Sequence, residues 1–328
     1  MRNTRIHLVG AVIAALLIAA CSTAAPQPGG KLLGPVSLFT GKDYLPAAAY
    51  VAQAEDLFAK NGVEVTHQTF NSGADAITAV RSAKAGFVMA GLLPSMKTWA
   101  VGDMIGIAPV GWSTESFSVL AAANIKSPAD LVGKKAATVN GSSGQIYLTI
   151  YLQGNGLEGK VEMVNLSPGD MPVALNRGDI AAYMWTQATT DAGLKAVPGA
   201  HLLQKGIKGI GNDIAMISAA KTTTQSSPDT VVAVLKALNA ANNFIATNPD
   251  QAAAIVAKFL GVEQSVARKN MDLEHYTMLY DDEFVKGARA DSAIALKLGM
   301  ISSPLDLKNH IDTTLLRKVD PKLVTAAQ

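Results

Sequence analysis

Short apolar stretches alternate with amphipathic segments through most of the chain, a pattern typical of α/β proteins. In the first part the expected strands span residues 36–39, 63–70, 86–90 and 105–110. The expected helices begin near Pro46 and at Ser72-Gly73 and cover residues 92–101. Asn61-Gly62 ends the first of these helices, since glycine is the usual residue after a helix C-terminus.

A second unit of similar pattern follows the apolar stretch 119–123. Ser127-Pro128 supplies an N-cap and a proline in the first helical turn. Strands are then expected at 136–139, 161–165 and 181–185, and helices near 144–153, 170–177 and 188–195. After the apolar run 214–219 the pattern changes to helices, the first with a stripe formed by Val231, Val234, Leu235, Leu238 and Ile245.

This order predicts an α/β protein of two lobes with a hinged cleft between them, where ligand sites are common. Lobe one is expected to comprise residues 35–121 and 217–328, and lobe two residues 122–216. The apolar stretches 119–123 and 214–219 would be the two crossing strands, and the helical C-terminal segment would pack on lobe one.

The first 20 residues predict an export signal. Arg2 and Arg5 precede an apolar run of 13 residues, 8–20, which is shorter than the roughly 20 residues a membrane span needs. The run ends at Ala20-Cys21 in a sequence similar to the bacterial lipobox. Residues 1–20 are therefore expected to be a lipoprotein signal peptide, Cys21 the lipidation site and residues 21–34 a flexible tether rich in Pro and Gly. The alternative is an ordinary signal peptide followed by a chance cysteine.

Charge and composition disfavour several classes of function. The chain has 28 Lys and Arg against 26 Asp and Glu, and removing residues 1–20 takes away two Arg and no acid, which leaves no net charge. No basic run is interleaved with aromatics, so nucleic acid is not an expected partner. The histidines lack metal-ligand spacing and no catalytic motif is found, so we expect no metal, no cofactor and no enzyme activity.

Two polar loops that precede predicted helices are candidate binding elements. One is Ser72-Gly73, and the other is residues 140–145, which include Ser142, Ser143 and Gly144. Glycine lets a ligand approach the backbone, and the first N–H groups of a helix attract an anionic group. The alternative is that both loops are only capped helix starts.

Further candidates follow the ends of predicted strands, where ligands of open α/β sheets bind. They are Asp43, Tyr44, Leu92, Leu93, Trp112, Glu115, Trp185 and Thr186. For the two tryptophans, a role as partly buried cover residues remains the alternative.

Several segments, taken in their order, resemble the periplasmic solute-binding proteins of nitrate/sulfonate/taurine importers, a family that includes binders of thiamine pyrimidine precursors. The segments are 59–65, 72–76, 125–135, 178–183 and 311–316, and the resemblance covers most of residues 36–319. It implies a type II periplasmic-binding fold that closes on a small molecule and docks on a membrane permease with its ATPase. It also implies that the loops at Asp43-Tyr44, Ser72-Gly73, Leu92-Leu93, Ser142-Ser143-Gly144 and Trp185-Thr186 line the cleft.

The acidic candidates bear on the ligand. Asp43 and Glu115 would place two carboxylates near the site, and like charges repel strongly in a cleft of low dielectric. We therefore expect a zwitterion of the taurine type, or a polar heterocycle with an amine, rather than nitrate or a plain alkanesulfonate.

The expected protein is a monomeric binding subunit of an ABC importer, held by its lipid in the periplasm or at the cell surface. Two alternatives stay open: an enzyme of pyrimidine or menaquinone-precursor metabolism on the same fold, and a sensory lipoprotein.

Overall fold

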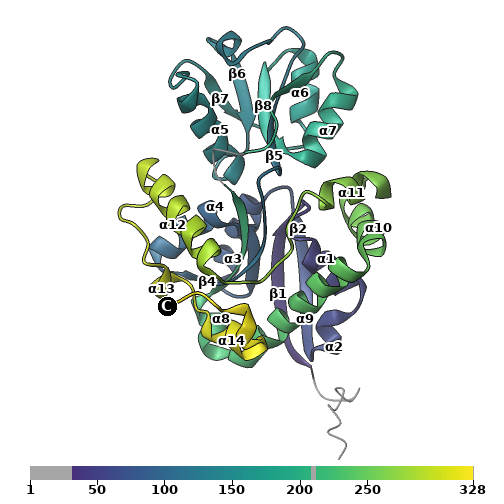
Figure 1. The fold of residues 1–328 in the computed structure, drawn as a ribbon, viewed down its shortest axis with the longest axis vertical. Coiled ribbons are helices and arrows are strands. Elements are labelled where there is room, and N and C mark those ends of the chain that lie inside the picture. Colours follow the sequence, from purple (N-terminus) through teal and green to yellow (C-terminus); the bar gives the residue numbers. More distant parts are fainter. Residues whose placement is uncertain (1–31, 208–211, 328) are drawn as a thin grey trace, which may run out of the picture. The chain divides into compact units, whose positions relative to one another are not determined.

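A computed structural model describes residues 32–207 and 212–327, and residues 31–328 form one compact unit. The expected signal peptide, Cys21 and most of the expected tether lie outside the described residues. Two five-stranded sheets, each flanked by helices, organise the unit (Figure 1).

The first sheet has the strand order β2-β1-β3-β10-β4. Its strands are β1 (Leu33–Gly41), β2 (Val63–Phe70), β3 (Phe87–Gly91), β4 (Met104–Ser113) and β10 (Asp213–Ala220). Strand β1 is parallel to β2 and β3, whereas β10 runs antiparallel to both β3 and β4. The helices that follow its first three strands are α1 (Ala47–Ala54), α2 (Leu57–Lys60), α3 (Gly73–Ala83) and α4 (Leu92–Val101).

The second sheet has the strand order β7-β6-β8-β5-β9. In chain order its elements are β5 (Phe117–Ala121), η1 (Pro128–Leu131), β6 (Lys135–Thr138), α5 (Ser143–Gly154), β7 (Glu162–Asn165), α6 (Met171–Arg177), β8 (Ala182–Thr186), α7 (Gln187–Ala196) and β9 (His201–Gln204). Strand β6 is parallel to β7 and β8, and β5 is antiparallel to β8 and β9. We call this sheet with its helices the second lobe.

The C-terminal segment is helical, as the sequence pattern predicts, and packs on the first sheet. It consists of α8 (Lys221–Ser226), α9 (Pro228–Thr247), α10 (Pro249–Leu260), α11 (Gln264–Met271), α12 (Asp282–Lys297), α13 (Leu307–His310), α14 (Thr314–Val319) and η2 (Pro321–Leu323). Helix α9 buries Val231, Val234, Leu235 and Leu238 and contacts α1 and α2, while α12 contacts α4. These helices and the first sheet form the first lobe. None of the helices within the described ranges is long and apolar enough to cross a membrane.

The two apolar stretches expected to cross between the lobes each belong to one sheet. Residues 117–121 form β5, which pairs on both sides within the second sheet, and residues 213–220 form β10, which lies between β3 and β4 of the first. The chain therefore passes between the lobes after Ser113 and again after Gln204, not at the expected 121/122 and 216/217. A strand buried on both faces gives the same unbroken apolar run as a crossing strand, so the pattern alone does not separate them.

Candidate functional site

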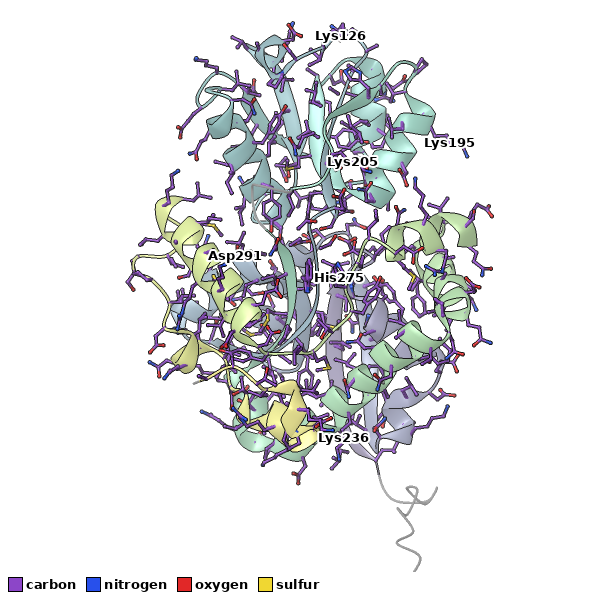
Figure 2. The ribbon with its side chains drawn as sticks, in the orientation of Figure 1. Lys126, Lys195, Lys205, Lys236, His275 and Asp291 are labelled. Atoms are coloured by element: carbon purple, nitrogen blue, oxygen red, sulfur yellow. The ribbon has the colours of Figure 1, made fainter. Side chains whose placement is uncertain are left out.

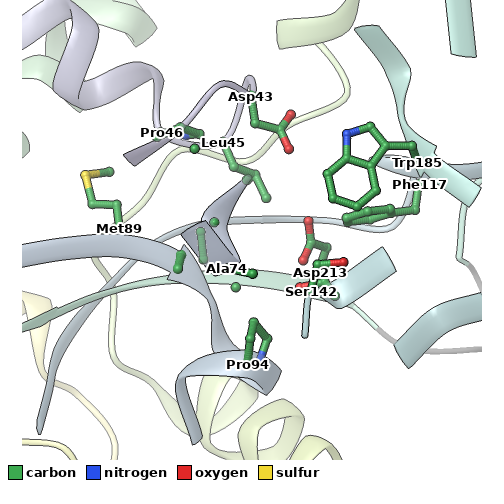
Figure 3. Close-up of a pocket in the computed structure, with 16 residues that line it drawn as sticks. Asp43, Leu45, Pro46, Ala74, Met89, Pro94, Phe117, Ser142, Trp185 and Asp213 are labelled. Atoms are coloured by element: carbon green, nitrogen blue, oxygen red, sulfur yellow. The ribbon is translucent and has the colours of Figure 1, made fainter. Parts of the chain in front are cut away.

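A small cavity of about 60 Å³ lies between the two sheets, where the carboxyl ends of several parallel strands meet (Figure 3). The first lobe contributes the loops after β1, β2 and β3 and part of β10, and the second lobe contributes the start of β5, the loop after β6 and the end of β8. Its lining includes Asp43, Gly73, Gly91, Ser143, Trp185 and Asp213. Ligands of α/β sheets bind at such strand ends.

The two lobes touch at one edge of this cavity. A side chain at Gly91, which precedes α4, would overlap the hydroxyl of Ser143, which begins α5. A Cβ on Gly144 would come within 2.8 Å of the Trp185 ring. Glycine at position 91 therefore permits the close approach of the two lobes, and glycine at position 144 lets the Trp185 ring pack against α5 within the second lobe.

Three helix N-termini face the cavity, those of α3, α4 and α5. The Ser72 hydroxyl accepts a hydrogen bond of 3.2 Å from the Asp75 backbone N–H, and the Ser142 hydroxyl accepts one of 3.3 Å from the Gln145 N–H. Both hydroxyls thus act as N-caps, and Ser72 does not line the cavity. These helices would therefore attract an anionic ligand mainly through the positive ends of their dipoles.

Asp43 follows β1 and presents its carboxyl group to the cavity (Figure 3). Its Oδ1 accepts a 2.7 Å hydrogen bond from the Tyr44 backbone N–H. The side chain keeps a partly exposed surface, but protein atoms surround it densely. Burial raises its pKa to about 7, and the Tyr44 N–H only partly offsets this.

Asp213 begins β10 and is the second carboxyl group of the cavity. It is 4% exposed, and its Oδ2 accepts a 3.1 Å hydrogen bond from the Ser116 hydroxyl. Its pKa is raised to about 7, mainly by burial and also by the charge of Asp43, while hydrogen bonds from Ser116 and Ser143 act in the opposite direction. Sequence reasoning missed this residue. The available signal was an acidic residue directly before the apolar run 214–219.

Two more acidic side chains are buried near these carboxyl groups. Burial, together with the charges of Asp43 and Asp213, raises the pKa of Glu274 well above its usual value. Burial also raises the pKa of Asp291 to about 8, with a smaller contribution from Asp213. Within the described part of the chain, none of these four acids forms an ion pair with Lys, Arg or His.

Aromatic rings form the wall on the second-lobe side. Trp185, at the end of β8, packs edge-on against Phe117 with ring centroids 5.8 Å apart. Phe117 in turn packs against Tyr147 of α5 at 5.3 Å. These contacts fix the orientation of the indole toward the cavity (Figure 3).

The structure brings five of the sequence-predicted residues together at the cavity: Asp43, Gly73, Ser142, Ser143 and Trp185. Four others lie directly behind this lining. Tyr44 is fully buried, Leu92 and Leu93 belong to the core, and Gly144 supports the Trp185 ring.

Three predicted residues lie elsewhere. Trp112 stacks on His275 with ring centroids 3.9 Å apart. Thr186 is the N-cap of α7 and lines a neighbouring groove with Lys42 and Leu260, on the other side of Trp185. Glu115 lies in the first connection between the lobes, between β4 and β5, and its carboxyl group is beside Gly206 of the second connection. The two carboxyl groups that share the cavity are therefore Asp43 and Asp213, rather than Asp43 and Glu115, because β10 enters the first sheet with its first residue at the cavity.

Comparison with known families identifies the chain. The family model described as NMT1/THI5 like matches residues 46–252, which is more than half of the chain. The chain belongs to the NMT1/THI5-like family. The match includes the second sheet, the first sheet except β1, and most of the cavity lining, although Asp43 precedes it.

Several proteins are similar to this NMT1/THI5-like chain in sequence. A putative aliphatic sulfonates-binding protein of Bacillus subtilis is 24% identical over 80% of this chain and 81% of its own length. The taurine-binding periplasmic protein of Escherichia coli is 35% identical over 43% of this chain and 45% of its own length.

Solved structures show the fold of this family member. The alkanesulfonate-binding protein SsuA of Xanthomonas axonopodis pv. citri, solved with bound MOPS, superimposes with a TM-score of 0.75, at 18% identity and coverage of 87% of this chain and 100% of that one. The desulfurization enzyme DSZB superimposes with a TM-score of 0.67, at 12% identity, covering 87% of this chain and 98% of that one. The predicted type II periplasmic-binding fold, with two α/β sheets and C-terminal helices, is confirmed.

Proposed function

We propose that this protein is the substrate-binding component of an ABC importer and that it captures a small zwitterion of the taurine type in the cavity between its lobes. Family membership and the names of the sulfonate- and taurine-binding relatives support the transport role. The cavity supports the ligand class. Its volume of about 60 Å³ favours a molecule of few heavy atoms.

The observation that carries the ligand assignment is that two carboxyl groups and three helix N-termini surround one cavity. Asp43 and Asp213 supply two carboxyl groups on the first-lobe side, and no Lys, Arg or His is among the described lining residues. An ammonium group between the two carboxylates would relieve their mutual repulsion. The N-termini of α3, α4 and α5 would receive an anionic group such as a sulfonate.

Calorimetry with three matched probes tests this assignment. Taurine carries both charges, ethanesulfonate lacks the amine, and ethylamine lacks the sulfonate. We expect taurine to bind about tenfold or more tightly than either single-charge probe, since a hydrogen bond to a charged group contributes on the order of 1.5–3 kcal/mol. Ethanesulfonate binding as tightly as taurine would contradict the role of the carboxyl groups.

The transport role also requires partners and a location. We propose that the closed protein docks as a monomer on a permease with its ATPase, and that lipidated Cys21 holds it at the membrane in the periplasm or at the cell surface. Mass spectrometry of the N-terminal peptide from the native host tests the anchor. A diacylglyceryl cysteine at Cys21 is expected, and a peptide that begins elsewhere without lipid would contradict it.

An enzyme on the same fold is the competing function, and the structural likeness to a desulfurization enzyme gives it a concrete form. We propose binding without chemistry, because the cavity lining within the described ranges holds no His or Cys beside Ser143 that could complete a nucleophile–base pair. After prolonged incubation with the protein, taurine should be recovered unchanged by NMR. Release of sulfite would show that the protein is an enzyme.

A further inference from the structure

The loop that carries Asp43 is tied to the C-terminal segment at its next residue, Tyr44. The Tyr44 side chain is fully buried. Its hydroxyl accepts a 3.2 Å hydrogen bond from the Asn270 amide at the end of α11, and its backbone carbonyl accepts a 3.1 Å bond from the Tyr276 hydroxyl. The Tyr44 backbone N–H in turn donates to the Asp43 carboxyl group.

The same Asn270 amide nitrogen also contacts the second lobe. It donates a 3.2 Å hydrogen bond to Oδ2 of Asp191 on α7. Asn270 is 1% exposed and Asp191 is partly exposed, so the amide end of this bond is shielded from water. Hydrogen bonds are electrostatically stronger away from water. Asp191 has no ion-pair partner within the described ranges of the chain.

These bonds form one connected path from the second lobe to the cavity. It runs from Asp191 through Asn270 and Tyr44 to Asp43. All of the first-lobe members are buried or line the cavity. A separation of α7 from α11 would break the path at its Asn270–Asp191 bond and leave the Asn270 amide without its second acceptor.

We propose that Asn270 is a positioning residue that latches the second lobe onto the loop of Asp43 and so couples closure of the lobes to the cavity. An amide suits this role because its two N–H groups serve two acceptors at once and it adds no charge beside the Asp191 carboxylate. The latch itself needs no ligand. Only its effect on affinity rests on the proposed function.

Changing the charge of the latch tests it directly. Asn270→Asp would place a second carboxylate against Asp191, and like charges at this separation repel strongly. Asp191→Ala would remove the same bond at a partly exposed position on α7, where loss of folding is not expected. Both variants should favour separated lobes.

The distance between the lobes can be measured by double electron–electron resonance. Spin labels would be placed by Lys126→Cys in the second lobe and Lys236→Cys on α9, both exposed and labelled in Figure 2, in a full-length chain with Cys21→Ser. Without ligand, the wild-type chain should show a population at the short distance, which Asn270→Asp and Asp191→Ala should deplete. Unchanged distributions, or no short-distance population in the wild type, would overturn the latch.

Two variants separate the latch from nonspecific effects. Asp191→Asn combined with Asn270→Asp restores a neutral–charged pair with reversed polarity and should recover the short distance. Asp179→Ala removes an exposed carboxylate of the second lobe outside the path and should leave the distances unchanged. If the Asp191→Asn/Asn270→Asp chain is folded by circular dichroism, as Asn270→Asp is, but does not recover the short-distance population, the latch is contradicted.

The affinity measurement keeps this test distinct from that of the proposed function. If taurine is the ligand, Asn270→Asp should raise its Kd by about tenfold, within the usual range of coupling between sites, and the swapped pair should reverse this. If taurine does not bind the wild type at all, the proposed function fails while the ligand-free distances still decide the latch. An unchanged Kd for bound taurine in Asn270→Asp would contradict the coupling.

Discussion

At the residue scale, the site depends on two carboxyl groups whose surroundings favour their protonated form. Burial raises the pKa of both Asp43 and Asp213 to about 7. Both groups are therefore partly protonated near neutral pH, which limits the repulsion between them in the empty cavity. A bound ammonium group would favour the ionised form of both.

The Asp213 side chain is the most direct test at this scale. Asp213→Asn keeps the shape and removes the charge, so the Kd of taurine should rise by about tenfold or more, given the 1.5–3 kcal/mol typical of charged hydrogen bonds. Asp291→Asn is the matched control, because Asp291 is buried with a pKa of about 8 but does not line the cavity. Calorimetry on both variants should show loss of affinity only for Asp213→Asn, and equal losses would contradict a direct contact.

Protonation also makes stability depend on pH. A carboxyl group whose folded pKa is raised from 3.8 to about 7 binds more protons in the folded than in the unfolded state between these values. Its contribution to the free energy of unfolding is therefore fully present below about pH 4 and is lost as the pH rises through 7. The Tm of the ligand-free wild type should fall more steeply than that of Asp213→Asn between pH 5 and pH 8.

The wild type must be compared with Asp213→Asn because other groups also titrate between pH 5 and pH 8. Burial lowers the pKa of His67 to about 4, which favours stability at higher pH and opposes the carboxyl groups. This contribution is common to the wild type and Asp213→Asn and cancels in the difference. Parallel Tm profiles would contradict the raised pKa of Asp213.

At the element scale, the closed cavity depends on where helices begin. The chain turns from β3 into α4 at Gly91, whose φ of −56° is accessible to any residue. Glycine is needed there for space rather than for backbone conformation, because Ser143 of the second lobe occupies the place of a side chain. The helix start thus sets how closely the lobes approach.

Gly91→Ala should therefore weaken ligand binding while leaving the fold intact. The added methyl group would overlap the Ser143 hydroxyl and hold the lobes apart, so the Kd of taurine should rise by about fivefold or more, the lower end of typical coupling. Gly154→Ala, near the end of α5 with open space around it, is the control and should raise stability by up to about 1 kcal/mol. Wild-type affinity in Gly91→Ala would show that the lobe contact is not needed for binding.

At the scale of the whole molecule, the two lobes are not successive domains. The chain leaves the first sheet after β4, builds the second sheet and returns as β10 to the middle of the first. All eight residues of β10 are buried. The strand that completes the first sheet therefore follows the whole second lobe along the chain, which couples the folding of the two lobes.

This connectivity predicts one cooperative unfolding transition. Circular dichroism and the fluorescence of the three tryptophans, which lie in both lobes, should give the same Tm. Taurine at about one hundred times its Kd should add about 2.7 kcal/mol to the free energy of unfolding. Two separated transitions would show that the lobes unfold independently, and a shift caused equally by ethanesulfonate would show that the amine does not contribute.

The sequence by itself determined the local structure and the class of fold. Ser72 and Ser142 cap the helices that their spacing predicts, and the stripe at Val231, Val234 and Leu235 is buried as expected. These features follow from caps and from hydrophobic periodicity, which act over a few residues. The export signal and Cys21 stay predictions.

Only the tertiary structure decided which side chains share the cavity. Asp213 meets Asp43 because β10 inserts antiparallel between β3 and β4, and Glu115 is directed elsewhere at the crossing between the lobes. Asn270 reaches both lobes because the C-terminal helices return to the first sheet. Such pairings depend on strand order and on packing between distant segments, and no local pattern encodes either.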